Sequence, residues 1–154
     1  MTIQLEMDDA GKALLLMIRK SIQEVYETLG KGYPENVYQK AMGVDLQLQN
    51  IKYDMEVTMG IPYKGHIVGY VRADTIIRGN IPVIIETKAT AAALKIEERW
   101  QLSRYLKIQE IPIGVLVNFP QVANAKEAQV EFLIVTDDEV LLWNIDTNEG
   151  TPLT

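Results

Sequence analysis

The apolar positions of the chain follow a helical period in its first third. Between residues 8 and 29 they recur at three- and four-residue steps, and the same spacing returns between residues 34 and 49. Gly30 and Gly32 separate the two segments, and Pro34 suits a first helical position. The pattern therefore predicts two amphipathic helices.

After Asn50 the period becomes two, which is typical of strands. Alternating residues predict strands over residues 53–62 and 66–77, and a short apolar strand over residues 81–87. Turn residues separate them at Lys64-Gly65 and at Gly79-Asn80. We expect these three strands to form an antiparallel meander.

The second half of the chain predicts one more helix and three more strands. Helical spacing returns over residues 91–109, followed by strands over residues 113–118, 130–136 and 139–145. The last two form a hairpin turned by Asp137-Asp138, and we expect the tail from Asp146 to fray. The strand over residues 130–136 and the hairpin after it are a candidate edge for a homodimer. The 154 residues thus read as one domain of order α-α-β-β-β-α-β-β-β.

Composition excludes several classes of site. The chain has no cysteine and one histidine, which rules out disulfides, thiolate zinc sites, a cysteine nucleophile and multi-histidine metal sites. No apolar run reaches the length of a membrane span, and the first ten residues carry acids rather than the basic start of a signal peptide. We expect a soluble intracellular protein, in the cytoplasm, nucleoid or nucleus, without a membrane partner.

The net charge of −6 argues against a protein that coats nucleic acid by bulk electrostatics. The acids are unevenly placed, however. Residues 1–120 contain fourteen Lys and Arg and fourteen Asp and Glu, whereas residues 121–154 contain Lys126 and seven acids. A local site for phosphate is therefore allowed, and we expect the acidic C-terminal hairpin to face away from any such substrate.

Candidate chemistry gathers around the third strand. Glu86 and Lys88 share one face of it, because side chains alternate along a strand. Asp74 lies opposite Glu86 only if paired residue numbers on the second and third strands sum to 160, with a three-residue loop at 79–81. A two-residue Gly79-Asn80 turn would place Asp74 on the other face.

Two carboxylates and the backbone carbonyl of Thr87 are hard oxygen ligands that suit magnesium or manganese. A nearby ammonium, that of Lys88, can orient a water or offset negative charge, so the cluster suits phosphodiester hydrolysis. Simpler explanations exist for each residue. Glu35 can favour the positive end of the second helix, and Asp74, Glu86 and Lys88 can form a self-satisfied ion-pair network.

Asp74 followed by Glu86-Thr87-Lys88 resembles the signature of the PD-(D/E)xK nucleases. Residues 32–38, Gly-Tyr-Pro-Glu-Asn-Val-Tyr, match the GxxExxY pattern of one branch of that superfamily, and the resemblance runs over residues 12–119. It implies a restriction-endonuclease-like fold of class α/β (α+β). Its αβββαβ core is a mixed sheet flanked by helices, here with an extra C-terminal β-hairpin at about residues 130–146.

The resemblance also implies roles. Asp74, Glu86 and the Thr87 carbonyl would ligate Mg2+ (or Mn2+), Lys88 would position the attacking water, and Glu35 would complete the acidic cluster. Further along the chain, Gln101 matches a helix glutamine near the catalytic residues, and two accessory positions are Tyr105 and Arg72.

The sequence departs from the family pattern at three places. Ala73 stands where the superfamily name has proline, Thr87 replaces an apolar residue, and Glu98-Arg99-Trp100-Gln101 stands where relatives often read HEAQ. All the named catalytic positions are nevertheless filled. The implied activity is that of a metal-dependent nuclease acting on DNA, in preference to RNA, in repair or recombination. The alternative is a catalytically inactive nuclease-fold module that binds nucleic acid or protein.

Overall fold

A single mixed sheet of eight strands organises the described residues, 2–4, 7–137 and 139–153, of this computed structural model. The strand order is β1-β8-β7-β6-β5-β4-β3-β2. Strands β4 and β5 are parallel and the other neighbours are antiparallel. The bounds are β1 Ile3–Gln4, β2 Tyr53–Tyr63, β3 His66–Ile77, β4 Val83–Lys88, β5 Ile113–Asn118, β6 Gln129–Val135, β7 Val140–Asn144 and β8 Glu149–Pro152. The predicted mixed α/β fold is confirmed.

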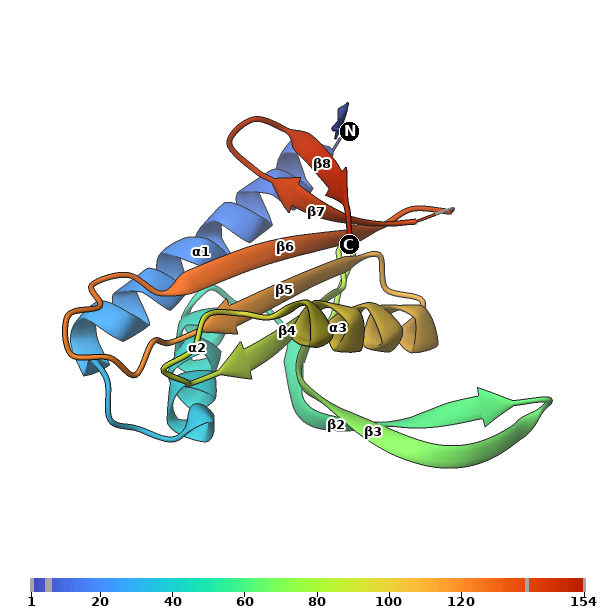
Figure 1. Cartoon of the computed structure of the whole chain (residues 1–154), viewed down its shortest axis with the longest axis horizontal. Helices are drawn as coiled ribbons and strands as arrows, with labels where there is room; N and C mark the ends of the chain where they lie inside the picture. The colour runs from blue at the N-terminus through green and yellow to red at the C-terminus, as the bar shows by residue number, and fades with distance from the viewer. Residues whose placement is uncertain (1, 5–6, 138, 154) are drawn as a thin grey trace.

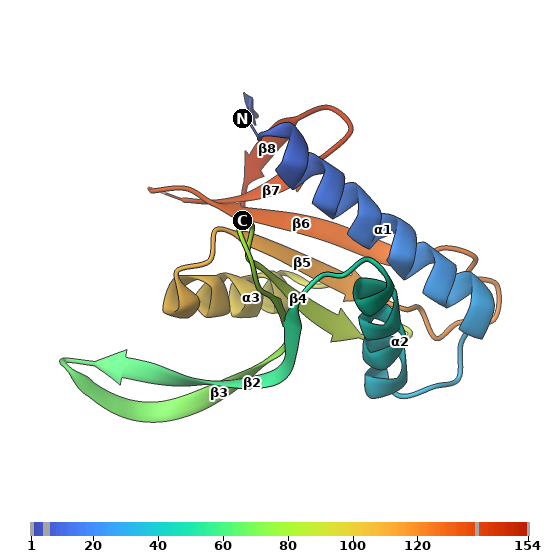
Figure 2. The same ribbon diagram turned by 180° about the vertical axis from the view of Figure 1, so that it is seen from behind.

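Three helices cover the two faces of the sheet (Figures 1 and 2). Helices α1 (Asp9–Leu29) and α2 (Glu35–Leu48) lie on one face, and α3 (Ile96–Gln109) lies on the other. The alternation along β4 explains the two cores, because Ile85 packs with α1 and α2 whereas Ile84 packs with α3. Glu86 and Lys88 share the parity of Ile84, so β4 presents them on the α3 side.

The register between β3 and β4 is the one that the candidate site requires. Thr75 pairs with Ile85, Ile76 with Ile84 and Ile77 with Val83, so the paired numbers sum to 160 as predicted. The ladder stops at Thr75 and Ile85. From Asp74 outward β3 leaves β4 and continues with β2 as a curved two-stranded ribbon that projects from the body (Figures 1 and 2).

The starts of helices α2 and α3 differ from the predictions. Pro34 is the N-cap of α2, which begins at Glu35. Helix α3 begins at Ile96 rather than near residue 91, because the side-chain amide of Asn118 bonds Thr90 N, Thr90 O and Ala92 O and holds that segment outside the helix. The helix then starts where Glu98 Oε1 accepts a hydrogen bond from Lys95 N at 3.0 Å.

The prediction that the tail frays from Asp146 is wrong. Residues 149–152 form β8, which pairs with β7 on one side and with β1 on the other. Strand β6, the predicted dimer edge, therefore lies inside the sheet between β5 and β7. The described edges are the two-residue β1 and the long β2. Among the described residues, no helix has the length and apolar character needed to cross a membrane.

Candidate active site

Asp74 and Glu86 meet at the point where β3 separates from β4. The backbone amide of Asp74 donates to Glu86 Oε1 at 2.9 Å, and the amide of Thr87 donates to Asp74 Oδ2 at 2.8 Å. These side-chain bonds replace the ladder bonds that end at Thr75 and Ile85. The backbone thus uses one oxygen of each carboxylate and holds the two acids side by side.

Burial disfavours the charged carboxylate form of Glu86 when no cation is bound. Its side chain is only 4 % exposed. Burial first, and then the negative charge of Asp74, raise the pKa of Glu86 to about 8, although the Asp74 amide and the Lys88 charge act in the opposite direction. At neutral pH this pair of acids therefore favours binding a proton or a cation.

Lys88 lies beside this pair of acids, and among the described residues its ammonium is not bound to either of them. It is half-buried, two residues after Glu86 on β4, and its charge lowers the pKa of Glu86. Within the described ranges, no salt bridge of 4.0 Å or less joins Lys88 to Asp74 or Glu86. The structure therefore does not contain the ion-pair network that was the simpler explanation for these residues.

The carbonyl of Thr87 faces the gap between the separated strands. In an extended strand the N–H and C=O of one residue point to the same side, and the Thr87 amide points to Asp74. The next carbonyl, that of Lys88, instead accepts a hydrogen bond from Phe119 N at 2.9 Å. Thr87 thus presents a backbone oxygen on the side where β3 has left β4.

Helix α3 brings Tyr105 and Gln101 to the acids. Tyr105 is 7 % exposed. Burial raises the pKa of its hydroxyl, and the charges of Glu86 and Asp74 raise it further, while hydrogen bonding with Gln101 opposes these effects. Tyr105 therefore lies within the electrostatic field of the acid pair, and Gln101 lies one helical turn before it on α3.

Helix α2 contributes a residue that the sequence analysis missed. The buried side chain of Gln39 donates from Nε2 to the carbonyl of Asp74. Gln39 lies one helical turn after Glu35, but this spacing alone does not indicate its bond to Asp74. Glu35 itself is exposed. Across residues 2–4, 7–137 and 139–153, no three Asp, Glu, His or Cys side chains converge on a site for a metal ion.

The tyrosine of the GxxExxY pattern is a structural anchor. Tyr38 is fully buried, stacks on Phe119 with ring centroids 4.4 Å apart, and donates its hydroxyl to Gly30 O at 2.6 Å. Gln121 donates to the same hydroxyl at 3.1 Å and accepts from Gly32 N at 2.7 Å. Two residues of the pattern are thus joined through Gln121, and this fixes the loop from which α2 starts.

Arg72 lies apart from the acid pair. Its side chain is 62 % exposed, and its guanidinium lies 4.0 Å from Glu56 at the base of the ribbon. The structure thus brings together Asp74, Glu86, Thr87, Lys88, Gln101 and Tyr105, and leaves Glu35 and Arg72 at the periphery.

The donor set fits a hard divalent cation. Magnesium is commonly bound through one or two carboxylates, and water or substrate phosphate completes its coordination. Asp74, Glu86 and the Thr87 carbonyl provide oxygen ligands alone. Burial and the charge of Asp74 raise the pKa of Glu86, so a bound cation would offset the repulsion between the two acids. The residues present therefore suit Mg2+ or Mn2+.

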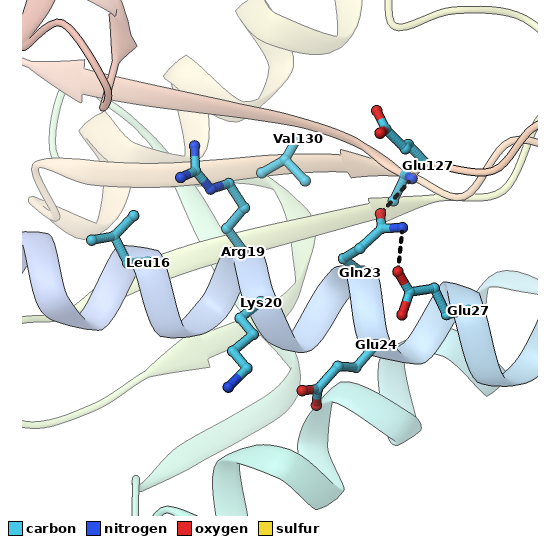
Figure 3. A pocket seen from close by; sticks show the side chains of 9 residues that line it. Leu16, Arg19, Lys20, Gln23, Glu24, Glu27, Glu127 and Val130 are labelled. Carbon is cyan, nitrogen blue, oxygen red and sulfur yellow. Dashed lines mark hydrogen bonds between the residues drawn. The ribbon is translucent and has the colours of Figure 1, made fainter.

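A hollow on the other side of the molecule has a structural explanation. It measures about 690 Å3 and lies between α1 and the start of β6, among Arg19, Gln23 and Val130 (Figure 3). Gln23 donates to Glu27 Oε1 and to Lys126 O, and accepts from Ala128 N. These bonds join the helix to the loop before β6, and no predicted site residue lines the hollow.

Strands β3 and β4 separate where they hold two carboxylates beside a lysine, and helices cover both faces of the mixed sheet. This combination defines a nuclease-type domain. The chain belongs to the PD-(D/E)XK nuclease superfamily, whose family model matches residues 12–131. Membership implies a hydrolase that acts on nucleic acid, in a superfamily that typically uses divalent metal ions.

Comparison with other proteins adds support for the fold alone. No curated protein matches the chain. The crystal structure of a protein named SSO0001 is similar with a TM-score of 0.51 at 18 % sequence identity. The match covers 94 % of this chain and 73 % of that one.

Proposed function

We propose that this protein is a Mg2+- or Mn2+-dependent nuclease of the GxxExxY branch, which hydrolyses phosphodiester bonds of DNA in preference to RNA, in repair or recombination. One observation carries the proposal. Asp74 and Glu86 are held together by backbone amides where β3 leaves β4, and Lys88 stands two residues further on without a salt bridge to either acid among the described residues.

Asp74, Glu86 and the Thr87 carbonyl would hold the cation. Bound there, it supplies Lewis acidity toward a phosphate oxygen and lowers the pKa of a bound water. Glu86 must lose its proton to serve as a ligand, because its pKa of about 8 leaves it largely protonated at neutral pH. Gln39 fixes the backbone of Asp74 from α2, which keeps this carboxylate in place.

Lys88 would act on the attacking water and on the charge that develops at phosphorus. Its ammonium is a compact donor of three hydrogen bonds, and it is not consumed by a salt bridge within the described residues. Gln101 and Tyr105 would orient the substrate or its water from the α3 side. Glu35, exposed at the start of α2, would complete the acidic cluster from outside the pair.

A cleavage assay tests the proposal. The purified protein is incubated with single-stranded, duplex, flapped and branched DNA, and with RNA of the same sequences, in Mg2+ or Mn2+. We expect Lys88→Ala and Glu86→Gln each to lose about 100-fold or more in kcat, since removal of one group that stabilises developing charge has an effect of this size. Lys107→Ala, an exposed lysine on α3, is the matched control and should cleave like the unaltered chain. Equal cleavage by Lys88→Ala would overturn the assignment.

Calorimetry separates an active nuclease from an inactive module of the same fold. The proposed nuclease binds Mg2+ or Mn2+ with release of protons, and Glu86→Gln removes that binding. A chain that binds no divalent cation, yet binds nucleic acid or a protein tightly, would instead be a binding module.

A further inference from the structure

We propose that the projecting β2–β3 ribbon is a nucleic-acid-binding arm that holds the substrate next to Asp74. The arm comprises residues 57–72, and its outer face comprises Thr58, Gly60, Ile67, Tyr70 and Arg72. The inference rests on the proposed function for the identity of the substrate. The ribbon leaves the body as a long curved hairpin (Figures 1 and 2).

Strand pairing assigns the residues of the arm to two faces. Thr58 pairs with Arg72 and Gly60 with Tyr70, so these four share one face. Beyond the irregularity at Ile61 and Pro62, Ile67 joins the same face, because a Cβ built on Gly60 would lie 3.0 Å from its Cδ1.

The opposite face is anchored in the α3 core. Met59, which pairs with Val71, is 1 % exposed, and Ala73, which pairs with Val57, is fully buried. One face of the arm therefore packs against the body of the protein, and the other face is exposed to solvent. Packing of the fold accounts for the inner face, whereas nothing in the described residues covers the outer one.

The outer face is unusually apolar and aromatic for a surface. Tyr70 is 72 % exposed and Ile67 is 55 % exposed, and the Arg72 side chain is 62 % exposed. At the tip, Lys64 Nζ lies 5.3 Å from the ring centroid of Tyr63, itself 60 % exposed. Gly60 stands opposite Tyr70, and the side chain of Ile67 fills the space over Gly60. Tyr70 is nevertheless 72 % exposed, so a flat partner has room to stack on its ring.

Charge favours nucleic acid over other partners. Residues 57–72 hold Lys64, Arg72 and His66 and no Asp or Glu, although the whole chain carries a net charge of −6. Glu56 borders the arm at its base, 4.0 Å from the Arg72 guanidinium. A face that binds a second copy of this chain through apolar contacts does not need to lack acidic side chains, whereas a face that binds a phosphate backbone does. Cations interleaved with exposed tyrosines match the chemistry of strand-binding surfaces. Arg72 lies two residues before Asp74, so a strand bound along the arm leads to the acid pair.

Binding measured without cleavage tests the arm. Fluorescence anisotropy with labelled single-stranded and duplex DNA is recorded in EDTA, for the unaltered chain, Tyr70→Ala, Arg72→Gln and the double variant. We expect the double variant to raise Kd by about 10-fold or more, since one stacked base and one phosphate contact are lost. Arg72→Gln should also reduce the slope of log Kd against log salt by about one. The matched controls are Leu48→Ala, an exposed apolar residue on α2, and Lys126→Gln, an exposed cation; both should keep the original Kd.

The outcomes separate this inference from the proposed function. Weaker binding by the arm variants, in a chain that cleaves no substrate, supports the arm and overturns the nuclease assignment. Cleavage by the unaltered chain with unchanged Kd in all arm variants overturns the arm alone. Sedimentation that shows a dimer dissociated by Tyr70→Ala, together with unchanged DNA binding, would assign the face to self-association and overturn the proposal.

Discussion

At the scale of single residues, the candidate site depends on where one strand pairing stops. Asp74 and Glu86 are ordinary acids in the sequence, and they become a coupled pair because the β3–β4 ladder ends one position before them. Glu86 is then buried, with one oxygen on the Asp74 amide. A buried acid beside another acid makes stability depend on protonation.

Stability without metal should fall as the pH rises. The pKa of Glu86 is about 8 in the fold against 4.5 ordinarily, so the folded state binds more protons than the unfolded state between these values. We expect the free energy of unfolding in EDTA to decrease across this window, by at most about 1.4 kcal/mol per pH unit. Urea titrations from pH 5 to pH 8 measure the slope. Glu86→Gln, which has no proton to lose, should flatten it, and equal slopes in both proteins would contradict the assignment.

The residues of the site differ in how far sequence could predict them. Alternation was sufficient to place Glu86 and Lys88 on one face of the third strand, whereas Asp74 was expected opposite Glu86 only in one of two possible registers. The β3–β4 pairing has that register. The role of Gln39 could not be found this way, because its bond to Asp74 O depends on how α2 crosses the sheet. That crossing is a tertiary property, which no local period encodes.

At the scale of elements, the sequence predicted long segments with a repeated hydrophobic period. It did not predict very short strands or segments whose conformation is fixed by hydrogen bonds from a side chain. Helices α1 and α2 and strands β2 to β5 lie close to their predicted ranges, since each repeats its pattern several times. Gly43 lies in α2 where a Cβ would be 2.5 Å from Met55 Cε, so this glycine allows close helix–strand approach rather than breaking the helix. Strands β1 and β8 have two and four residues, too few to show a period.

We expect one ion pair to stabilise the packing of helix α3 on the sheet. Arg99 donates two hydrogen bonds to Glu131 on β6, both at 2.7 Å, and the side chains are only 24 % and 21 % exposed. This geometry favours a real contribution. We expect a double-mutant cycle with Arg99→Gln and Glu131→Gln to give a coupling energy of about 1 kcal/mol or more, measured by urea unfolding.

The pair between Arg19 and Asp146 is the internal control for that cycle. Its atoms are 3.2 Å apart, but its side chains are 38 % and 71 % exposed. An exposed pair of this kind contributes little, so its cycle should give less than about 0.5 kcal/mol. Equal coupling in the two cycles would show that the Arg99–Glu131 geometry has no special effect on α3.

At the scale of the whole molecule, the sheet extends well beyond the nuclease-like core. Strands β6, β7 and β8 add to β5, and β8 receives β1 from the start of the chain. Trp143 on β7 is 3 % exposed, and its Nε1 donates to Asn148 Oδ1 at 3.3 Å. The segment expected to fray therefore completes the packing of β7.

Removal of residues 147–154 should destabilise the protein. The deletion takes away the β8 partner of β7 and the cover of Trp143. We expect the free energy of unfolding to fall by about 2 kcal/mol or more, in the range of buried apolar losses, with a red shift of tryptophan emission. The control is Thr147→Ala, an exposed loop residue. Unchanged stability of the shortened chain would mean that β8 is dispensable.

The placement of acids along the sheet has a consequence for encounter rates. Residues 121–154, whose described part includes β6 to β8, contain seven acids and one lysine in sequence, whereas the arm at the other end of the sheet contains Lys64 and Arg72 and is bordered by one acid, Glu56, at its base. The molecule is therefore an electric dipole along the strand order, despite its net charge. Near a polyanion such a dipole experiences a torque that turns its cationic end inward, so productive orientation precedes contact and weakens as salt screens the field.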